Sequence, residues 1–496
     1  MFKRCIPLLL IAGMPLLGQQ PDRLSIQACM ESAWKDLSAL PQELRPGTRY
    51  IGLWHLDSLE DRIEATAALS VICNGMSRRK HMEPLAVVPG SKIAVLRVNL
   101  DDYRWDHKVW DRLADPHTTI GGRDEWWPGG VWPTSKGGDG KYYEPANYRT
   151  KVIAAPWLGD KAPEVAGWTG STVAMVNGGW FAHQMLTCTD EDGNLRNPSY
   201  YDFLGIKNEK DFQRLTGTNV DLAEEFGAVQ REAVGISGVT RKPRAFVFLG
   251  KLGGFYYKTL DFQSSREARN ALAVLGKDIE KKARASEQIA GLVNGLLAYG
   301  LFDLTKKDNP VVDRAPDTVA GSRTLPGNFL AVQNPIGCID CHRDRSLQPI
   351  DGWIRNLLTP PLDIYTPDYK KRLQLRDEYL SDLEESLEHG RKSYERAVKD
   401  CSKRAGKEMT ATQFADSCRK LFVTHEEPRT LASSAAYLGV STEAWAKALD
   451  QRIRQIRGPL PLSQLILGKG RQQVVPYDVF EEYIEEAQLI LRGYVK

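Results

Sequence analysis

Cys338-Ile339-Asp340-Cys341-His342 is the stretch of the chain from which the rest of the sequence can be interpreted. Cys-x-x-Cys-His is the pattern at which haem of the c type is attached. Two thiols at this spacing can form thioethers with the two vinyl groups of one porphyrin, and the adjacent imidazole reaches the iron from the proximal side. The pattern therefore predicts one covalent haem c, bound by Cys338 and Cys341, with His342 as the proximal iron ligand.

Two other chemistries use a Cys-x-x-Cys pair. A structural zinc site needs two further Cys or His ligands at ligand spacing, and the sequence has no second Cys-x-x-Cys and no His-x(3–5)-His. A thioredoxin-type dithiol opens a helix directly after a strand, whereas here the turn-forming residues 334–337 precede the first cysteine. Both alternatives have less support in the sequence than haem attachment.

The N-terminus has the charge and polarity order of a secretory signal. Lys3 and Arg4 precede the apolar run 5–17, and the polar residues 18–21 end it. We therefore expect a signal peptide over residues 1–20 and a periplasmic or secreted protein, which agrees with the attachment of haem c outside the cytoplasm. No later stretch approaches about eighteen apolar residues, so we expect no transmembrane segment in the mature chain.

Composition excludes some partners. The chain has 496 residues, of which 42% are hydrophobic and 26% charged, and its formal net charge is +3. A charge so close to zero gives no indication of a nucleic-acid partner. The chain has eight cysteines. Cys401 and Cys418 lie on two consecutive predicted helices joined by a short connection, which favours a disulfide between them in an oxidising compartment.

Periodicity predicts an α+β fold with a mixed helix and strand haem-bearing body and an all-helical C-terminal domain. The N-terminal α+β segment, 21–115, contains helical patterns over 24–40 and 59–74 and an alternating strand pattern over 92–100. Residues 116–170 form a Gly- and Trp-rich insertion with little periodicity. Eight of the twelve tryptophans lie between Trp105 and Trp180, so the insertion could cover a haem edge or pack on the core.

The second half of the chain changes from strands to helices. The segment 171–360 is strand-rich and carries the haem motif: 244–249 and 255–262 predict a hairpin, and 289–304, with Asn294-Gly295, predicts further pairing. The helical C-terminal domain is 361–496. Its helical patterns cover 369–401, 412–421, 431–438, 443–456, 462–467 and 477–491.

The chain resembles exported, single-haem, cytochrome-c-like proteins of planctomycetes and myxobacteria, whose reactions are largely unassigned. The matching stretches are 49–56, 95–105, 237–241, 256–262, 294–299 and the haem motif. The resemblance implies a haem protein and does not supply a substrate. The insertion at 116–168 has no counterpart in it.

The second axial position of the iron decides what such a haem does, because a His or Met ligand supports electron transfer and an open position permits chemistry on small molecules. The resemblance places a histidine at His55, which is our candidate for the distal ligand. Arg241, which follows the turn-like residues 237–240, is a candidate partner for a haem propionate. The other upstream candidates for the distal ligand are His107, His183, Met76, Met82, Met175 and Met185.

The sequence thus predicts an exported c-type cytochrome that transfers single electrons to or from a redox partner protein whose identity the sequence does not give. Two alternatives stay open: a haem enzyme with peroxidase-like activity, and a haem-bearing binding or sensor module. Nucleophile-elbow, zinc-protease, phosphate-loop and dinucleotide motifs are all missing from the sequence, so hydrolytic and nucleotide-driven functions have no support.

Overall fold

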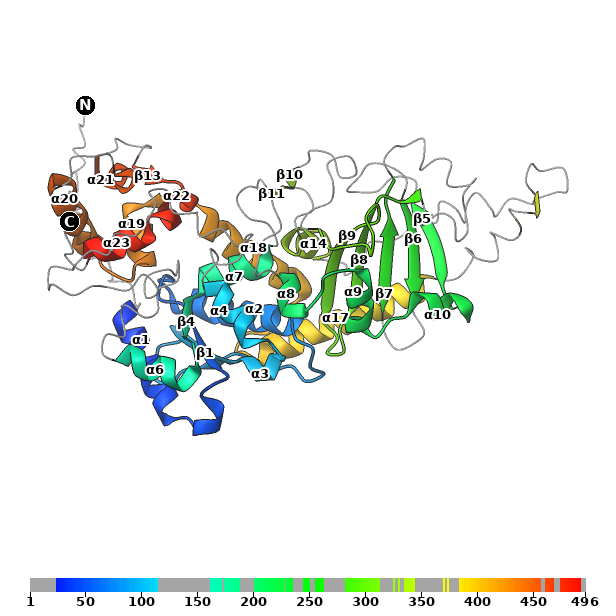
Figure 1. Ribbon diagram of the computed structural model, residues 1–496, viewed down its shortest axis with the longest axis horizontal. Helices are drawn as coiled ribbons and strands as arrows, with labels where there is room; N and C mark the ends of the chain where they lie inside the picture. The colour runs from blue at the N-terminus through cyan, green and yellow to red at the C-terminus, as the bar shows by residue number, and fades with distance from the viewer. Residues whose placement is uncertain are drawn as a thin grey trace, which may run out of the picture.

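A computed structural model describes most of the chain (Figure 1). The described residues are 24–114, 161–171, 174–187, 200–226, 228–234, 244–249, 255–262, 282–312, 324–325, 329–330, 334–343, 369–370, 373, 383–455, 460–467 and 473–491. The predicted signal peptide and almost all of the predicted insertion at 116–170 lie outside these residues.

A four-stranded sheet with the strand order β2-β3-β1-β4 forms the N-terminal part. β1 (Thr48–Gly52) pairs antiparallel with β3 (Val95–Asn99) and parallel with β4 (Met175–Asn177), and β2 (Ala86–Val87) pairs with β3. β3 begins later than the strand predicted over 92–100, because Lys92 and Ile93 have left-handed backbone angles that place them in the preceding turn. The helices around this sheet are α1 (Ile26–Ala39), the 3-10 turn η1 (Gln42–Leu44), α3 (Leu100–Tyr103), α4 (His107–Ala114) and α6 (Ala162–Thr169).

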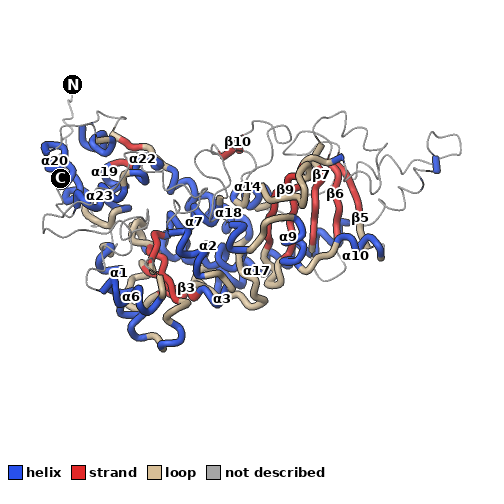
Figure 2. Tube along the Cα trace, in the orientation of Figure 1, coloured by secondary structure: helices blue, strands red, loops and turns tan. Residues whose placement is uncertain are grey.

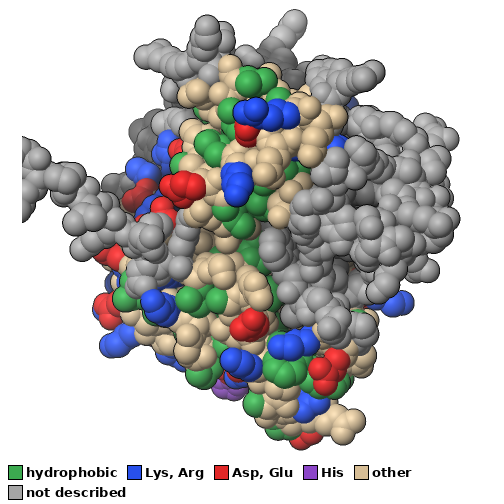
Figure 3. All heavy atoms as spheres, turned by 90° about the vertical axis from the view of Figure 1, so that its left-hand side faces the viewer, with side chains coloured by type: hydrophobic (Ala, Val, Ile, Leu, Met, Phe, Trp, Pro, Cys, Tyr) green, Lys and Arg blue, Asp and Glu red, His purple; other side chains and the backbone are tan. Residues whose placement is uncertain are grey.

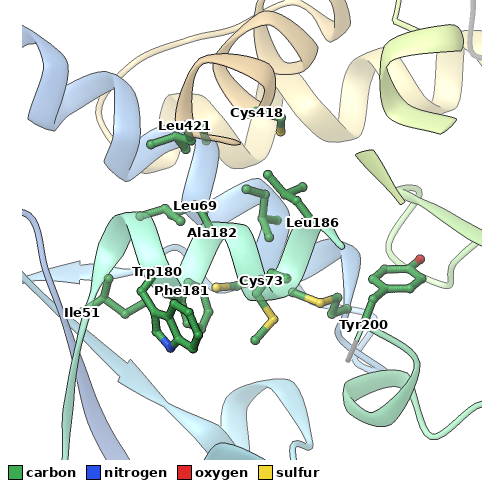
Figure 4. Packing of buried hydrophobic residues seen from close by; sticks show 14 of the residues in the cluster. Ile51, Leu69, Cys73, Trp180, Phe181, Ala182, Leu186, Tyr200, Cys418 and Leu421 are labelled. Carbon is green, nitrogen blue, oxygen red and sulfur yellow. The ribbon is translucent and has the colours of Figure 1, made fainter. Parts of the chain in front are cut away.

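Two buried helices occupy the centre of the molecule. α2 (Leu59–Gly75) begins at Ser58, whose hydroxyl accepts from the amide of Asp61, and is buried on all sides from Ala65 to Asn74. α7 (Gly178–Leu186) is buried along its whole length. Figure 4 shows Trp180, Phe181 and Leu186 of α7 packed among Leu69 and Cys73 of α2 and Leu421 of the C-terminal region. Such a fully enclosed helix needs apolar residues on all sides rather than one stripe, and the buried polar residues Thr66, Ser70 and Asn74 of α2 donate to carbonyls one turn earlier.

A five-stranded antiparallel sheet follows in the order β5-β6-β7-β8-β9, at the right of Figure 1. Neighbouring strands in the sheet are neighbours in the sequence, as the predicted hairpin and the apolar run after it require. The turn between the last two strands uses Gly295 at φ 87°, a conformation that favours glycine. The strands are β5 (Gln230–Val234), β6 (Arg244–Leu249), β7 (Tyr256–Leu260), β8 (Ala285–Gly291) and β9 (Leu297–Asp303).

Helices cover this sheet on both faces. Glu209 of α9 (Glu209–Thr216) is buried against one face, where its carboxylate lies 2.7 Å from the ammonium of Lys258. The opposite face, which includes Glu287 and Tyr299, contacts α14 (Ile336–Cys341), the helix that carries the Cys-x-x-Cys-His pattern. The remaining elements of this part are α8 (Tyr200–Leu204), α10 (Val220–Glu225), β10 (Thr324–Leu325) and β11 (Phe329–Leu330).

The C-terminal part is helical, as Figure 2 shows in blue, with one small exception. β12 (Arg429–Thr430) and β13 (Val474–Val475) form a two-stranded sheet, so the prediction of an all-helical domain over 361–496 is wrong in this detail. The helical elements described there are α17 (Leu383–Arg404), α18 (Ala411–Glu426), α19 (Leu431–Tyr437), α20 (Thr442–Gln455), η5 (Pro461–Ser463), α21 (Gln464–Leu467), α22 (Tyr477–Glu482) and α23 (Ile484–Leu491).

One hydrophobic core connects the N-terminal and C-terminal parts. α17 packs against α2, and α18 packs against both α7 and α2. The indole N–H of Trp54, just after β1, donates to the carbonyl of Tyr437 in α19 over 3.0 Å. Residue 361, which we predicted as a domain boundary, therefore does not separate two hydrophobic cores.

The fold is α+β, as predicted. Figure 3 shows basic and acidic side chains interspersed over the face that it presents, without a large patch of one sign. Among the described residues, no helix combines the length and the apolarity needed to cross a membrane.

Candidate functional site

α14 places the two cysteines of the motif on one side of a short helix. Asn334 and Pro335 form the turn before it, and the amide of His342 donates to the carbonyl of Cys338 over 3.0 Å at its end. Residues three apart on a helix lie on the same face, so Cys338 and Cys341 point in similar directions. Neither sulfur is in a disulfide.

All three side chains of the motif converge on Glu287 of β8. The thiol of Cys338 lies 3.7 Å from Oε1 of Glu287, and Nε2 of His342 lies 3.9 Å from the same oxygen. Glu287 also acts electrostatically on Cys341. The sheet therefore presents a single carboxylate to both thiols and to the imidazole.

A buried arginine holds that carboxylate in place. Nη1 of Arg244 lies 3.0 Å from Oε2 of Glu287, and its Nη2 lies 2.9 Å from Oδ2 of Asp261. Burial alone would lower the pKa of Arg244, but the two carboxylates hold it above its ordinary value. With one cation and two anions, the group formed by Arg244, Asp261 and Glu287 carries a formal charge of −1 beside the motif.

The thiols of the motif are poorly suited to disulfide exchange. The pKa of Cys341 is raised to about 12, mainly by burial and also by the charges of Glu287 and Asp340. A redox dithiol needs a cysteine that ionises readily near neutral pH. The structure thus gives no support to the dithiol alternative. For zinc, no group of three or more His, Cys, Asp or Glu side chains is arranged to hold a metal ion in the part of the chain that the structure describes.

A small cavity borders α14. Its volume is about 30 Å³, and it is lined by Pro335 and Ile339 together with Tyr299 of β9, Tyr394 of α17 and other mostly apolar side chains. Such a space is about the size of one water molecule and is far too small for a porphyrin. At the end of the helix, Arg343 pairs with Asp416 of α18 over 3.0 Å. The motif is thus fixed from behind by the core and at its end by α18.

The motif supplies the donor groups of a covalent haem. Two thiols one turn apart and an imidazole directly after them are the groups that c-type attachment uses. Both Cys338 and His342 face Glu287 of β8 and are buried against the sheet, so a haem held by Cys338, Cys341 and His342 would have to displace this contact.

His55 lies in a different place. It is close to Asn177, Tyr437 and His425, with ring centroids 6.4 Å apart for His55 and Tyr437. His425 stands near the C-terminal end of α18, whereas Arg343, the neighbour of His342, contacts Asp416 nine residues earlier in that helix. Nine residues of helix span about 13 Å. The structure does not bring His55 and His342 to one iron.

The proton on His55 also argues against iron ligation through Nε2. Oδ1 of Asn177 accepts the amides of Gly179 and Trp180 at the start of α7, so its Nδ2 is the atom that faces Nδ1 of His55, at 3.1 Å. Nδ2 is a donor, and Nδ1 must therefore accept. In the neutral ring the proton is then on Nε2. A histidine that binds iron through Nε2 carries its proton on Nδ1 instead.

Other predicted residues are placed as follows. Arg241 lies outside the described residues. Cys401 and Cys418 are both buried free thiols, so the predicted disulfide is not formed in this structure. Cys401 faces α2, where Nδ2 of Asn74 lies 3.5 Å from its sulfur. The prediction failed because it considered only the sequence connection between the two helices and not the helix on which α17 packs.

Glu287 is the site residue that sequence reasoning missed. A weak signal for it existed, because a charged residue stands in a buried strand that pairs on both sides. A carboxylate enclosed in this way needs a charged or hydrogen-bonding partner, and the partner comes from β6, more than forty residues earlier.

Comparison with known proteins adds no relatives: the chain matches no protein-family model, no curated protein and no solved structure.

Proposed function

We propose that the protein is an exported c-type cytochrome that binds one haem covalently through Cys338 and Cys341 and transfers single electrons to or from a partner protein in the periplasm or outside the cell. The observation that supports this most strongly is that two thiols and the His342 imidazole lie together on one side of α14. The haem-bearing body would consist of the sheet β5–β9 with α14 and the helices behind it.

The haem, when bound, supplies a one-electron redox couple. The residues of this chain have separate tasks around it. Cys338 and Cys341 would form the thioethers, and His342 would ligate the iron. Glu287, held by Arg244, contributes negative charge beside these residues. A nearby negative charge favours the ferric over the ferrous state, so this group should lower the reduction potential.

A spectroelectrochemical titration of the full chain, purified from a host that matures c-type cytochromes, tests the proposal. We expect a haem spectrum whose reduction follows a single one-electron wave. Oxidised protein that is low-spin and does not bind carbon monoxide after reduction supports electron transfer.

Two results would count against the proposal. Protein without haem absorbance would refute haem binding. High-spin iron that binds carbon monoxide and consumes peroxide would instead support the haem enzyme. Cys418→Ala serves as the matched control for substitutions in the motif, because it removes a buried thiol outside α14.

A further inference from the structure

A second cavity, separate from the haem motif, lies where α2, α18, α19 and the start of α7 meet. Its volume is about 570 Å³, within the range of small-molecule sites. Apolar side chains line part of it, among them Leu56, Ala65 and Leu421, and polar groups line the remainder. Polar groups beside apolar surface are what a site needs to orient one ligand.

His55 contributes a hydrogen-bond donor to this cavity. The amide of Asn177 fixes the proton on Nε2, as described above. Burial lowers the pKa of His55 to about 3, and the charge of Arg429 and the ring of His425 act in the same direction. At neutral pH the side chain is thus an uncharged ring with one N–H donor, which suits an acceptor oxygen.

Gly179 leaves room beside that donor. A Cβ at this position would lie 3.2 Å from both Oδ1 of Asn177 and Nε2 of His55, and 3.6 Å from Nδ1 of His425. The backbone of Gly179 is helical, so an alanine there would crowd these side chains rather than strain the backbone. Glycine at this position therefore keeps the space next to His55 open; the backbone conformation does not require it.

Arg429 supplies positive charge to the same wall. Its Nη1 and Nη2 donate to the carbonyls of Thr424 and His425 at the end of α18, and its guanidinium lies 5.1 Å from the ring centre of Tyr437. Its Nε is buried and has no acceptor among the described residues. An anionic oxygen would complete the set of acceptors around this guanidinium.

Of the three acidic residues that line the cavity, Asp57 is exposed, and Asp61 and Glu64 pair with lysines. Asp61 lies 2.8 Å from Nζ of Lys420, and Glu64 lies 3.0 Å from Nζ of Lys407. Their charge is therefore compensated locally, and Arg429 and the His55 donor determine which ligand group the opposite wall prefers.

We propose that this cavity binds a small aromatic carboxylate, with its carboxylate accepting from Nε2 of His55 and facing Arg429, and with its ring against Tyr437. The rings of His55, His425 and Tyr437 form the flat surfaces for the ligand ring. The ring centroids of His55 and His425 lie 6.4 Å and 6.1 Å from that of Tyr437. The site does not include Cys338, Cys341 or His342, so it stands independently of the proposed haem.

Calorimetric titration of the full chain with benzoate, benzamide and benzylamine tests this proposal. We expect one benzoate per chain, binding of benzamide that is weaker by about tenfold or more, and no binding of benzylamine. The tenfold difference corresponds to the loss of one charge-assisted hydrogen bond. Benzamide that binds as tightly as benzoate, or wild-type protein that does not bind benzoate at millimolar concentration, would overturn the proposal.

Two variants locate the ligand. Gly179→Ala fills the space beside His55, and His55→Phe keeps the ring but removes the donor; each should weaken benzoate binding by about tenfold or more. Gly167→Ala, at an exposed helical glycine with nothing within 4 Å of the added Cβ, is the matched control and should bind as the wild type does. Because His55→Phe can fail to fold, Gly179→Ala decides alone in that case: a folded Gly179→Ala protein with unchanged affinity places the ligand elsewhere.

Discussion

The side-chain amide of Asn177 donates from Nδ2 to Nδ1 of His55 over 3.1 Å. The same amide caps α7 through Oδ1, which accepts from the backbone of Gly179 and Trp180. One residue thus starts a central buried helix and fixes the proton of a histidine in a neighbouring cavity. A change at Asn177 should therefore affect both the stability of α7 and the protonation of His55.

Replacement of Asn177 by Ala should therefore cost more stability than the loss of an ordinary helix cap. Asn219 is the matched control, because it caps α10 through a single exposed bond to the amide of Leu222. We expect a loss of about 1 kcal/mol for Asn219→Ala. Asn177→Ala should lose roughly 2 kcal/mol or more, since three hydrogen bonds disappear in a buried place. Urea unfolding measures both, and equal losses would contradict this role.

His55 should make the protein sensitive to acid. Its pKa in the folded state is lowered to about 3, mainly by burial, from the ordinary value of 6.5. Below about pH 6.5 the unfolded chain therefore binds a proton that the folded protein does not bind, and stability falls as the pH falls towards 3. Each pH unit in this window should cost about 1.4 kcal/mol through this group.

Unfolding curves of His55→Phe and wild type between pH 7 and pH 5 test this dependence. The variant should lose less stability on acidification than the wild type. Parallel pH profiles would show that His55 titrates normally.

Arg244 should be among the residues whose loss destabilises the fold most. Arg244→Met leaves Asp261 and Glu287 buried without their cation, at a cost of about 3–5 kcal/mol. The control is Arg97→Met, which breaks an ion pair with Asp36 in which the arginine side chain is 32% exposed. That change should cost about 1 kcal/mol or less. Denaturant unfolding of both variants measures the two losses of stability. Similar small losses would mean that the buried ion pairs of Arg244 contribute little.

Glu287 should set the reduction potential of the proposed haem. Glu287→Gln removes one buried negative charge beside His342 and leaves Arg244 paired with Asp261. Ferric iron loses more stabilisation than ferrous iron, so the potential should rise by about 60 mV or more, equivalent to about 1.4 kcal/mol for one electron. Spectroelectrochemistry measures the shift. A potential that does not change would show that the carboxylate does not act on the iron.

Local sequence patterns predicted the elements well. The helical pattern over 59–74 corresponds to α2, and the apolar run at 289–304 with its Asn294-Gly295 turn corresponds to β8 and β9. These predictions succeed because periodicity, caps and turn residues act over a few neighbouring positions. The start of β3 was predicted too early, since positive backbone angles at Lys92 and Ile93 have no strong signal in those residue types.

The arrangement of the sites could not be predicted in the same way. Glu287 and Arg244 meet at the motif only because β6, β7 and β8 pair in order, and His55 meets Asn177 only because β1 and β4 are parallel neighbours. Such contacts depend on pairing between distant segments. The Cys401 prediction failed for this reason, because the neighbours of Cys401 are residues of α2 more than three hundred positions away.

The intact mass of the mature protein tests the central claim most directly. Expressed with the c-type maturation machinery, the chain should carry the mass of one haem that denaturation and acid extraction do not remove. Cys341→Ala should keep a haem attached through one thioether, the double variant with Cys338→Ala should carry none, and Cys418→Ala should match the wild type. A wild-type protein with the mass of the unmodified polypeptide in that host would contradict the assignment of Cys338, Cys341 and His342 as a haem site.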